Sequence, residues 1–362
     1  MGFFNSLFTK KEAPIHSNAD FWKWFKQQEK AFYKITKSGE NIHDFHDKLS
    51  PKLNELREGY FFLSGMCTDD VAELVITADG HIKNFAFVED LIADAPAIKG
   101  WQFTALKPAM DIHTYGIKMD GFDFSAETLS FYPNEDKNHP DEIDITVVHS
   151  DLTEDNKDSV ILGTHIFLDN YLGEINFATT IDAISVISKT HAEKELISIE
   201  KLKAYLIWRE KEFVEKYEGI RHNTDTDGYC TFEGSLENGN TVVAVINTTL
   251  LEWDSVASHP WIARIEIGYD GSNSGGLPHR NDFSGLNSFE DTLLIQLKDS
   301  DGYLNIGRET GDNTRTIYFA CNDFRKPSKV IDALAKQYQG VWDISYSIYK
   351  DKYWQTFNRF CQ

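Results

Sequence analysis

The chain has few cysteines and no long hydrophobic run. Four of its 362 residues are cysteine, and they lie too far apart to form a CxxC pair. This spacing indicates neither a disulfide framework nor a cysteine-ligated zinc site. No apolar stretch approaches the ~20 residues that a membrane-spanning helix needs. Because no signal peptide precedes the cysteines, we expect reduced thiols and a cytoplasmic location.

Basic residues are scarce relative to acidic ones. The chain has 36 Lys and Arg against 57 Asp and Glu, which gives a net charge of −21. No basic stretch is available to neutralise phosphates, so we expect no direct binding to nucleic acid or to an anionic membrane. The charge would suit a basic protein partner, although solubility alone is a sufficient explanation.

Motifs for catalysis and cofactor binding are also missing. The sequence contains no GxxxxGK[ST], GxGxxG, GxSxG or HExxH pattern. The segment SNSGG at 272–276 follows a predicted strand, but about ten residues separate it from the next predicted helix. We therefore interpret it as a flexible loop rather than a phosphate site. We assign no catalytic residue and no cofactor.

Two clusters of polar residues are candidate sites. His43 and His46 are three residues apart on a predicted helix, but no third or fourth metal ligand is evident, so a solvated helix face is favoured. A second cluster occupies 139–149. In this cluster, Asp144 and His149 are an odd number of residues apart, so their side chains point to opposite faces of a regular strand. This placement favours a polar hairpin over a proton relay. No metal ligand is assigned.

The spacing of apolar residues along the chain predicts an α+β fold. Apolar spacings of three and four predict helices, and period-two patterns predict strands. Helices stand between hairpins rather than between every pair of strands. This order favours mainly antiparallel sheets, each covered by helices on one face, and a ferredoxin-like arrangement is possible. Predicted helices are 18–36, 42–56, 85–94, 151–171, 198–217, 286–297 and 327–338, and weaker strands are predicted at 174–178 and 183–187.

The length is sufficient for two domains, each with its own core. We take the charged helix at 198–217 as the boundary element. The expected organisation is a flexible tail at 1–14, an N-terminal α+β domain at 15–195 and a C-terminal α+β domain at 196–362. The first residues, MGFFNS, also fit an N-myristoylation pattern with Gly2 and Ser6, but an unstructured tail is the favoured interpretation.

The most informative local pattern is YLNIGRETGDNTRTIYFAC at 303–321, which predicts a β-hairpin. Glycine at the first central position of Gly311-Asp312 suits a type II′ turn. That turn sets Arg308 directly opposite Arg315, at the end of one apolar face. The residues predicted on this face are Leu304, Ile306, Arg308, Arg315, Ile317, Phe319 and Cys321.

Two arginines opposed across a strand pair need compensation, because like charges at this distance are unfavourable. Acidic neighbours from elsewhere in the chain are the favoured explanation. The alternative is that Arg308 and Arg315 bind a small anion, since guanidinium groups suit carboxylate and phosphate. These two arginines are the predicted ligand-binding residues.

The C-terminal half contains five distinctive segments, which are HPWIARIEIGYD (259–270), GGLP (275–278), FEDTLLIQL (289–297), GRETGDNTRTIYFA (307–320) and DKYWQTF (351–357). In these segments, over roughly 222–358, the chain resembles a bacterial family catalogued as domain of unknown function 695. The N-terminal segment 73–109, ELVITADGHIKNFAFVEDLIADAPAIKGWQFTALKPA, resembles part of an uncharacterised bacterial domain.

The resemblance implies no catalytic residue. Members of the family are similar in setting to the ribonuclease E inhibitor B family, a small ferredoxin-like domain that regulates a ribonuclease by binding it. We therefore favour a non-catalytic binding or regulatory module that contacts an unknown protein partner. The alternatives are a small-anion binder or enzyme that uses Arg308 and Arg315, and a regulator like the ribonuclease inhibitor. The oligomeric state is left open.

Overall fold

The structure, a computed structural model, describes residues 13–361, which form two compact units divided between Pro108 and Ala109. The predicted myristoylation site at Gly2 and residues 1–12 of the predicted tail lie outside the described part. The expected domain boundary between residues 195 and 196 falls within the second unit, and the division into domains at this position stays a prediction. Taken together the sheets are mainly antiparallel and are combined with helices, so the fold is α+β as expected.

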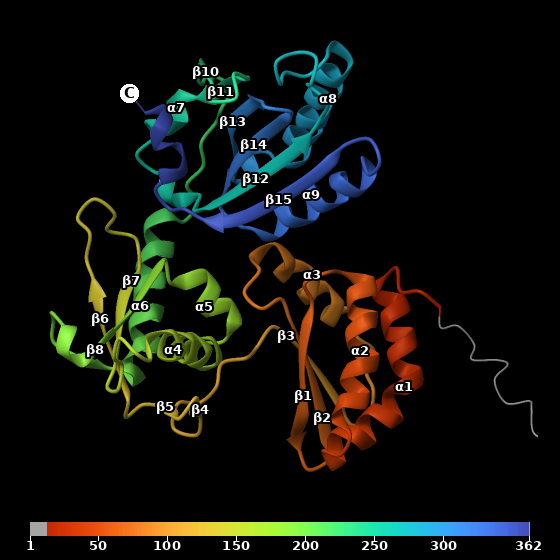
Figure 1. The fold of residues 1–362 in the computed structure, drawn as a ribbon, viewed down its shortest axis with the longest axis vertical. Helices are drawn as coiled ribbons and strands as arrows, with labels where there is room; N and C mark the ends of the chain where they lie inside the picture. The colour runs from red at the N-terminus through yellow and green to blue at the C-terminus, as the bar shows by residue number, and fades with distance from the viewer. Residues whose placement is uncertain (1–12, 362) are drawn as a thin grey trace, which may run out of the picture. The chain divides into compact units, whose positions relative to one another are not determined.

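The first unit packs helices against a three-stranded sheet. Helices α1 and α2 lie side by side along this sheet (Figure 1). Strands β1 and β2 form an antiparallel hairpin, whereas β3 is parallel to β2 because α3 connects them. The elements are α1 (Asn18–Ser38), α2 (Ile42–Leu56), β1 (Phe61–Thr68), β2 (Val71–Thr77), α3 (Ile82–Ala93) and β3 (Trp101–Ala105).

The second unit begins with a four-stranded sheet of order β8-β7-β6-β9. Strands β6 and β7 form a hairpin, and β8 lies parallel to β7 after the helices α4 and α5. The elements are β4 (Ile117–Met119), β5 (Phe122–Phe124), β6 (Leu129–Asn134), β7 (Asp144–His149), α4 (Lys157–Leu172), α5 (Glu174–Thr180), β8 (Ala183–Ser188), β9 (Ile197–Ser198) and α6 (Leu202–Tyr217).

The C-terminal part is a six-stranded antiparallel sheet of order β10-β11-β13-β14-β12-β15. The elements are β10 (Tyr229–Ser235), β11 (Thr241–Asn247), α7 (Thr248–Leu251), β12 (Trp261–Gly268), α8 (Arg280–Gln296), β13 (Tyr303–Gly311), β14 (Thr314–Cys321), α9 (Arg325–Gln337), β15 (Asp343–Lys350) and the 3₁₀ helix η5 (Gln355–Phe360).

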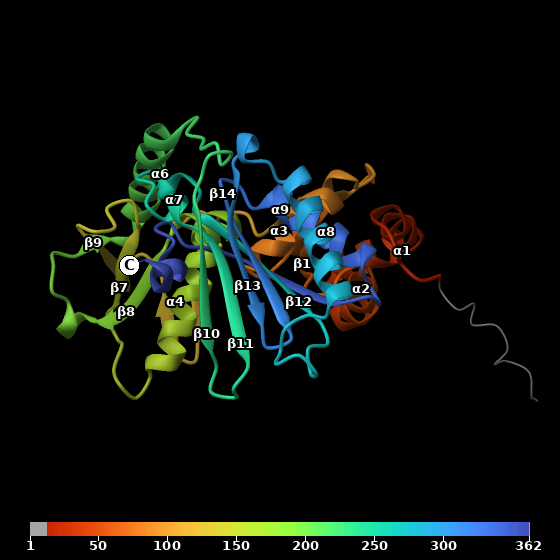
Figure 2. The ribbon, with the colours of Figure 1, turned by 90° about the horizontal axis from the view of Figure 1, so that it is seen from above.

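Within this sheet, β12-α8-β13-β14-α9-β15 follows the ferredoxin-like order, in which β14 and β12 lie between β13 and β15. Helices α8 and α9 lie on one side of the strands (Figure 2). The opposite face is partly covered by η5, whose Phe357 packs with Leu304 and Tyr318. None of the helices within 13–361 has the length and apolar character needed to cross a membrane.

The segment 174–178, predicted as a strand, is helical and belongs to α5. Gly173, with φ of 81°, redirects the chain after α4. Its carbonyl then accepts a hydrogen bond from Phe177 N at 2.9 Å, which starts a new helix. Phe177 packs against the core from this helix, so tertiary contacts outweigh the weak local preference of the segment for a strand.

The hairpin between β13 and β14 turns at a different place from the one predicted. Asp312 and Asn313 are the central residues, and their φ values of 50° and 65° are those of a type I′ turn rather than type II′. Arg315 therefore lies opposite Thr310, and the predicted opposition of Arg308 and Arg315 is wrong.

The predicted single apolar face of the hairpin is also wrong. A β-bulge between Asn305 and Gly307 interrupts the alternation of side chains, so residues before the bulge no longer share a face with the β14 residues predicted beside them. As a result, Leu304 and Ile306 pack on the side of η5. Tyr318 of β14 also packs on the side of η5. Because successive side chains of a strand point to opposite faces, Ile317 lies on the other side of the sheet. The hairpin therefore contributes to two cores, one on each face of the sheet.

Candidate functional site

Arg308 and Arg315 both reach α8, where a single carboxylate lies between them. Arg308 Nη1 donates to both oxygens of Glu290 at 3.0 Å, and Arg315 Nη1 lies 3.9 Å from Glu290 Oε2. Arg315 is fully buried and also donates to Asn287 Oδ1 at 2.8 Å and to Thr310 Oγ1 at 3.1 Å. The expectation that an acidic neighbour compensates the two arginines is confirmed by Glu290.

Burial lowers the pKa of Arg315 to about 10; the charge of Arg308 adds to this effect, and Glu290 opposes it. Arg315 therefore remains charged at neutral pH. The guanidinium of Arg315 is almost completely covered, whereas the side chain of Arg308 is 29 % exposed. The role of Arg308 and Arg315 in binding a small anion stays a prediction.

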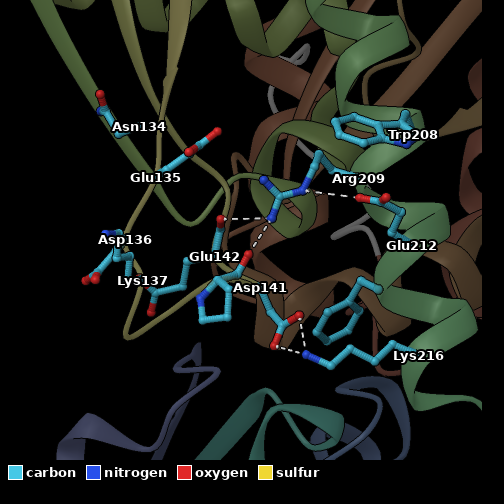
Figure 3. A pocket seen from close by; sticks show the side chains of 12 residues that line it. Asn134, Glu135, Asp136, Lys137, Asp141, Glu142, Trp208, Arg209, Glu212 and Lys216 are labelled. Carbon is cyan, nitrogen blue, oxygen red and sulfur yellow. Dashed lines mark hydrogen bonds and ion pairs between the residues drawn. The ribbon is translucent and has the colours of Figure 1, made fainter.

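A cavity of about 540 Å³ lies between the β6–β7 loop and helix α6 (Figure 3). Residues 134–142 form one wall, and residues 208–216 form the other. Five acidic and three basic side chains line it, together with Trp208 and Phe213. The walls come from segments about 70 residues apart in the chain, and their positions depend on the hydrogen bonds described next.

Asp141 joins the cavity wall to two other segments. Its carboxylate accepts hydrogen bonds from Lys216 Nζ at 2.8 and 2.9 Å, from Tyr217 OH at 2.8 Å and from Tyr353 OH at 2.8 Å. Its backbone N–H donates to Tyr353 OH at 3.0 Å, and its carbonyl accepts from Lys352 Nζ at 2.6 Å. The loop is thus held both by α6 and by the segment that follows β15.

These contacts make Asp141 a structural anion. Burial by itself would raise its pKa, but the hydrogen bonds from Lys216, Tyr217 and Tyr353 outweigh burial and hold the pKa below its ordinary value of 3.8. The pKa of Tyr353 is raised, first by burial and also by its bond to Asp141. A general base for neutral pH needs a raised pKa, so Asp141 does not fit that role.

Asp182 forms a second junction between the same parts of the unit. Its carboxylate accepts from Lys350 Nζ and Lys352 Nζ, both at 2.8 Å, and from Ile143 N at 2.6 Å. Burial lowers the pKa of Lys350 to about 8, and the charge of Asp182 opposes this shift. The end of β15 is therefore tied to the sheet that contains β7 and β8.

Arg209 fixes the cavity wall from the helix side. Its Nη2 donates to the carbonyl of Pro140 at 2.7 Å and to that of Glu142 at 3.3 Å, while Nη1 donates to Tyr205 OH at 3.2 Å. The planar guanidinium suits two carbonyls at once. Arg209 therefore holds the backbone of the loop in position.

The outer part of the cavity combines an exposed indole with three carboxylates. Trp208 is 53 % exposed. Glu135 is exposed and has no ion-pair partner within the described residues, and Glu212 lies 3.9 Å from Arg209 Nε. Burial raises the pKa of Glu142, which the charge of His139 offsets only in part. Carboxylates beside an aromatic face provide favourable contacts for a cation.

The sequence indicated part of this cavity without identifying it. Asp141 and Glu142 belong to the segment interpreted as a polar hairpin. Asp144 and His149 of that segment form no relay: Asp144 accepts from Asn134 Nδ2 at 3.0 Å, and His149 Nε2 lies 3.0 Å from the carbonyl of Asp123. Across residues 13–361, no three His, Cys, Asp or Glu side chains gather as metal ligands would.

Trp208 was not singled out from the sequence, although a signal was present. The predicted helix at 198–217 has its apolar side at Leu202, Leu206 and Phe213, and Trp208 lies off that side. A large aromatic residue on the polar side of a helix marks a contact surface more often than a core. The partners of Asp141 had no such signal, because they are 75 to 212 residues away in the chain.

The C-terminal sheet is the part of the chain that is similar to a known family. Residues 230–361 match the family of unknown function DUF695. The DUF695 match includes the β13–β14 hairpin and the segment 351–357 that carried the resemblance in the sequence. It includes Lys350, Lys352 and Tyr353 but not the cavity walls, and no family model matches the N-terminal half. Searches of curated proteins and of solved structures found no match to this chain.

Proposed function

We propose that this chain is a binding module that recognises a basic segment of a protein partner at the cavity between the β6–β7 loop and α6. The observation that carries the proposal is that one cavity combines Glu135 and Glu142 on its loop wall with Glu212 and the exposed indole of Trp208 on its α6 wall. A lysine or arginine side chain in this cavity would contact carboxylates and an aromatic face together.

Electrostatics and rigidity support this proposal. A cation beside Glu142 would offset the burial that raises the pKa of this carboxyl. The walls are held in place before binding by Asp141 and Arg209, which limits the entropy lost when a partner docks. A net charge of −21 also accelerates encounter with a basic partner.

Fluorescence anisotropy tests the proposal with a labelled peptide that contains three arginines separated by uncharged residues. The same peptide with citrulline in place of arginine should bind much more weakly. The double variant Glu135→Gln/Glu212→Gln should weaken binding of the arginine peptide by about three- to tenfold, because an exposed ion pair contributes roughly 0.2 to 1 kcal/mol.

A charge-matched control separates the cavity from the overall charge of the chain. Glu233 and Glu237 are exposed and lie outside the cavity, on β10 and in the turn that follows it. The double variant Glu233→Gln/Glu237→Gln removes the same charge and should change the affinity less than twofold. Equal losses in the two double variants would reject the cavity as the binding site.

The ferredoxin-like order of β12 to β15 favours a second candidate function. It is the topology implied by the resemblance to the ribonuclease E inhibitor B family, so regulation of a ribonuclease by direct contact is the runner-up. Shared topology does not by itself transfer a function. A cleavage assay with ribonuclease E decides: an unchanged rate at a large excess of this chain would reject the candidate.

An anion-binding or catalytic role for Arg308 and Arg315 is the weaker alternative. Glu290 already pairs with Arg308 and lies near Arg315, so a ligand anion would have to compete with it. Titration with phosphate tests this role, and binding that is lost in Arg308→Gln would support it.

A further inference from the structure

A second cavity, of about 660 Å³, lies on the face of the C-terminal sheet that carries η5. Its floor consists of side chains from β12, β13, β14 and β15, and Thr356 and Arg359 of η5 form part of its rim. Polar groups dominate the floor, including Thr314, Thr316 and Ser347. This cavity is separate from the one beside α6, and the two share no lining residue.

Two arginines meet in this cavity. Arg264 comes from β12 and Arg359 from η5, and their side chains are 40 % and 52 % exposed. Arg264 lies directly opposite Tyr318 of the neighbouring strand β14, and Arg359 Nη2 lies 3.5 Å from the hydroxyl of Tyr318, so both arginines lie next to this tyrosine in the cavity. In a chain with a net charge of −21, such a pair of accessible guanidinium groups is a local exception.

Each arginine uses only part of its hydrogen-bonding capacity in its ion pair. Arg264 Nη2 donates to Glu266 Oε1 at 2.8 Å, and Arg359 Nη2 donates to Glu309 Oε1. The Nε and Nη1 groups of both arginines have no carboxylate partner among residues 13–361. A guanidinium has five N–H donors, so each of the two retains donors for an oxyanion.

Hydroxyl groups surround the two arginines. Tyr318 OH donates to Glu309 Oε1 at 2.8 Å, and the hydroxyls of Tyr349 and Thr356 are 3.1 Å apart. Burial raises the pKa of both Tyr318 and Tyr349, so both phenols are protonated at neutral pH, and Tyr318 directs its hydrogen to Glu309. Glu309 and the threonine hydroxyls can accept hydrogen bonds in return.

We propose that this cavity binds a small anionic sugar, either a sugar phosphate or a sugar acid. The anionic group lies between Arg264 and Arg359, where two guanidinium forks match the geometry of an oxyanion. The sugar hydroxyls bind Glu309 and the hydroxyl side chains of the sheet, which together supply donors and acceptors in the pattern that a polyol requires.

Isothermal titration calorimetry of the full chain tests this assignment with glucose 6-phosphate, glucuronate, glucose and inorganic phosphate. The two anionic sugars should bind, and glucose should bind at least tenfold more weakly because it lacks the oxyanion. Inorganic phosphate should also bind more weakly than glucose 6-phosphate. Equal affinity for these two phosphates would overturn the assignment, because the hydroxyl groups of the sheet would then contribute nothing.

Two variants locate the binding site. Arg264→Gln and Arg359→Gln should each reduce affinity for the anionic sugars at least tenfold, as expected for loss of a charge-assisted hydrogen bond. Both side chains are partly exposed, and unchanged amide spectra would show that the fold is retained. Arg221→Gln removes the same charge from an exposed position outside the cavity and should change affinity less than twofold. Equal losses in all three variants, or no heat with either anionic sugar at millimolar concentration, would overturn the proposal.

Discussion

Tyr353 and Asp141, which are 212 residues apart in the chain, exchange two hydrogen bonds. The phenol donates to the Asp141 carboxylate at 2.8 Å and accepts from the Asp141 backbone N–H at 3.0 Å. One hydroxyl thereby fixes both the side chain and the main chain of the loop. This pair links the cavity wall to the segment that follows β15.

The replacement Tyr353→Phe should destabilise the second unit by about 1 to 3 kcal/mol, because it leaves a half-buried carboxylate and an amide short of a partner. Urea unfolding followed by tryptophan fluorescence would measure the loss. Tyr132→Phe is the matched control, since the Tyr132 hydroxyl has no hydrogen-bond partner within residues 13–361. Similar losses in the two variants would contradict the importance assigned to the Tyr353 hydroxyl.

The lowered pKa of Asp141 predicts sensitivity to acid. A carboxylate with a lower pKa in the folded state stabilises that state above the pKa of the unfolded chain, here near 3.8. This contribution is lost as the pH falls through the folded pKa. Asp141→Asn should therefore flatten the decline in unfolding free energy below about pH 5, measured by urea unfolding in steps of pH. A decline as steep as that of the wild type would count against this role.

His259 predicts a second dependence on pH, in a different window. Burial lowers its pKa to about 4, and the charges of Arg221 and His222 add to the effect; its Nε2 is buried without a hydrogen-bond partner. The unfolded chain binds the proton first, near pH 6.5. Stability should therefore fall as the pH decreases from 6.5 to 4, by on the order of 3 kcal/mol, and then level off.

The variant His259→Gln should remove this slope between pH 6.5 and pH 4. His113→Gln is the control, because the side chain of His113 is 73 % exposed. Unfolding free energies at pH 7 and pH 4.5 are sufficient for the comparison. Retention of the full pH effect in His259→Gln would show that another group is responsible.

Glu290 is expected to be the most sensitive residue of the arginine cluster. Glu290→Gln would leave the guanidinium groups of Arg308 and Arg315 near each other without compensation. Removal of the partner of a buried charge costs about 3 to 5 kcal/mol. Arg308→Gln should cost much less, about 1 kcal/mol, because its side chain is partly exposed. Thermal and urea unfolding would rank the two variants, and the reverse order would contradict the role of Glu290.

Gly307 should not tolerate a side chain. Its φ is 138°, and a Cβ atom would lie 2.2 Å from the carbonyl oxygen of Val245 on the neighbouring strand. Gly307→Ala should therefore cost well over 1 kcal/mol and reduce hydrogen-exchange protection in β11 and β13. Gly234→Ala, in β10 of the same sheet, meets nothing within 4 Å and should be nearly neutral. Equal stability of the two variants would contradict the bulge geometry at Gly307.

The class of the fold follows from local patterns, because apolar periodicity and turn residues act over a few positions. The helix at 18–36 and the hairpin at 303–321 are both present, and Cys321 is buried as expected. The register of the hairpin was not predictable in the same way. Near the turn the register is set by the central residues Asp312 and Asn313. Beyond Gly307 it is shifted by the bulge at Ile306, where Gly307 approaches the neighbouring strand in a tertiary contact.

The candidate site was harder to predict than the fold. Glu290 of α8 forms hydrogen bonds with Arg308 and lies 3.9 Å from Arg315, yet its position in the sequence gave no sign of this. The cavity beside α6 depends on Asp141, whose partners come from α6 and from beyond β15. Contacts between distant segments leave no periodic trace, so spacing rules could not reveal them.

The late position in the chain of Lys350, at the end of β15, and of Lys352 and Tyr353 after it has a consequence for the order of folding. During synthesis, Asp141 and Asp182 emerge long before Lys350, Lys352 and Tyr353, which are their partners. The β6–β7 loop therefore lacks its hydrogen bonds to Lys352 and Tyr353 until almost the whole chain has left the ribosome. The hydrogen bonds between Asp141 and α6 can form earlier, so the bonds from the C-terminal residues are the last that this loop can acquire.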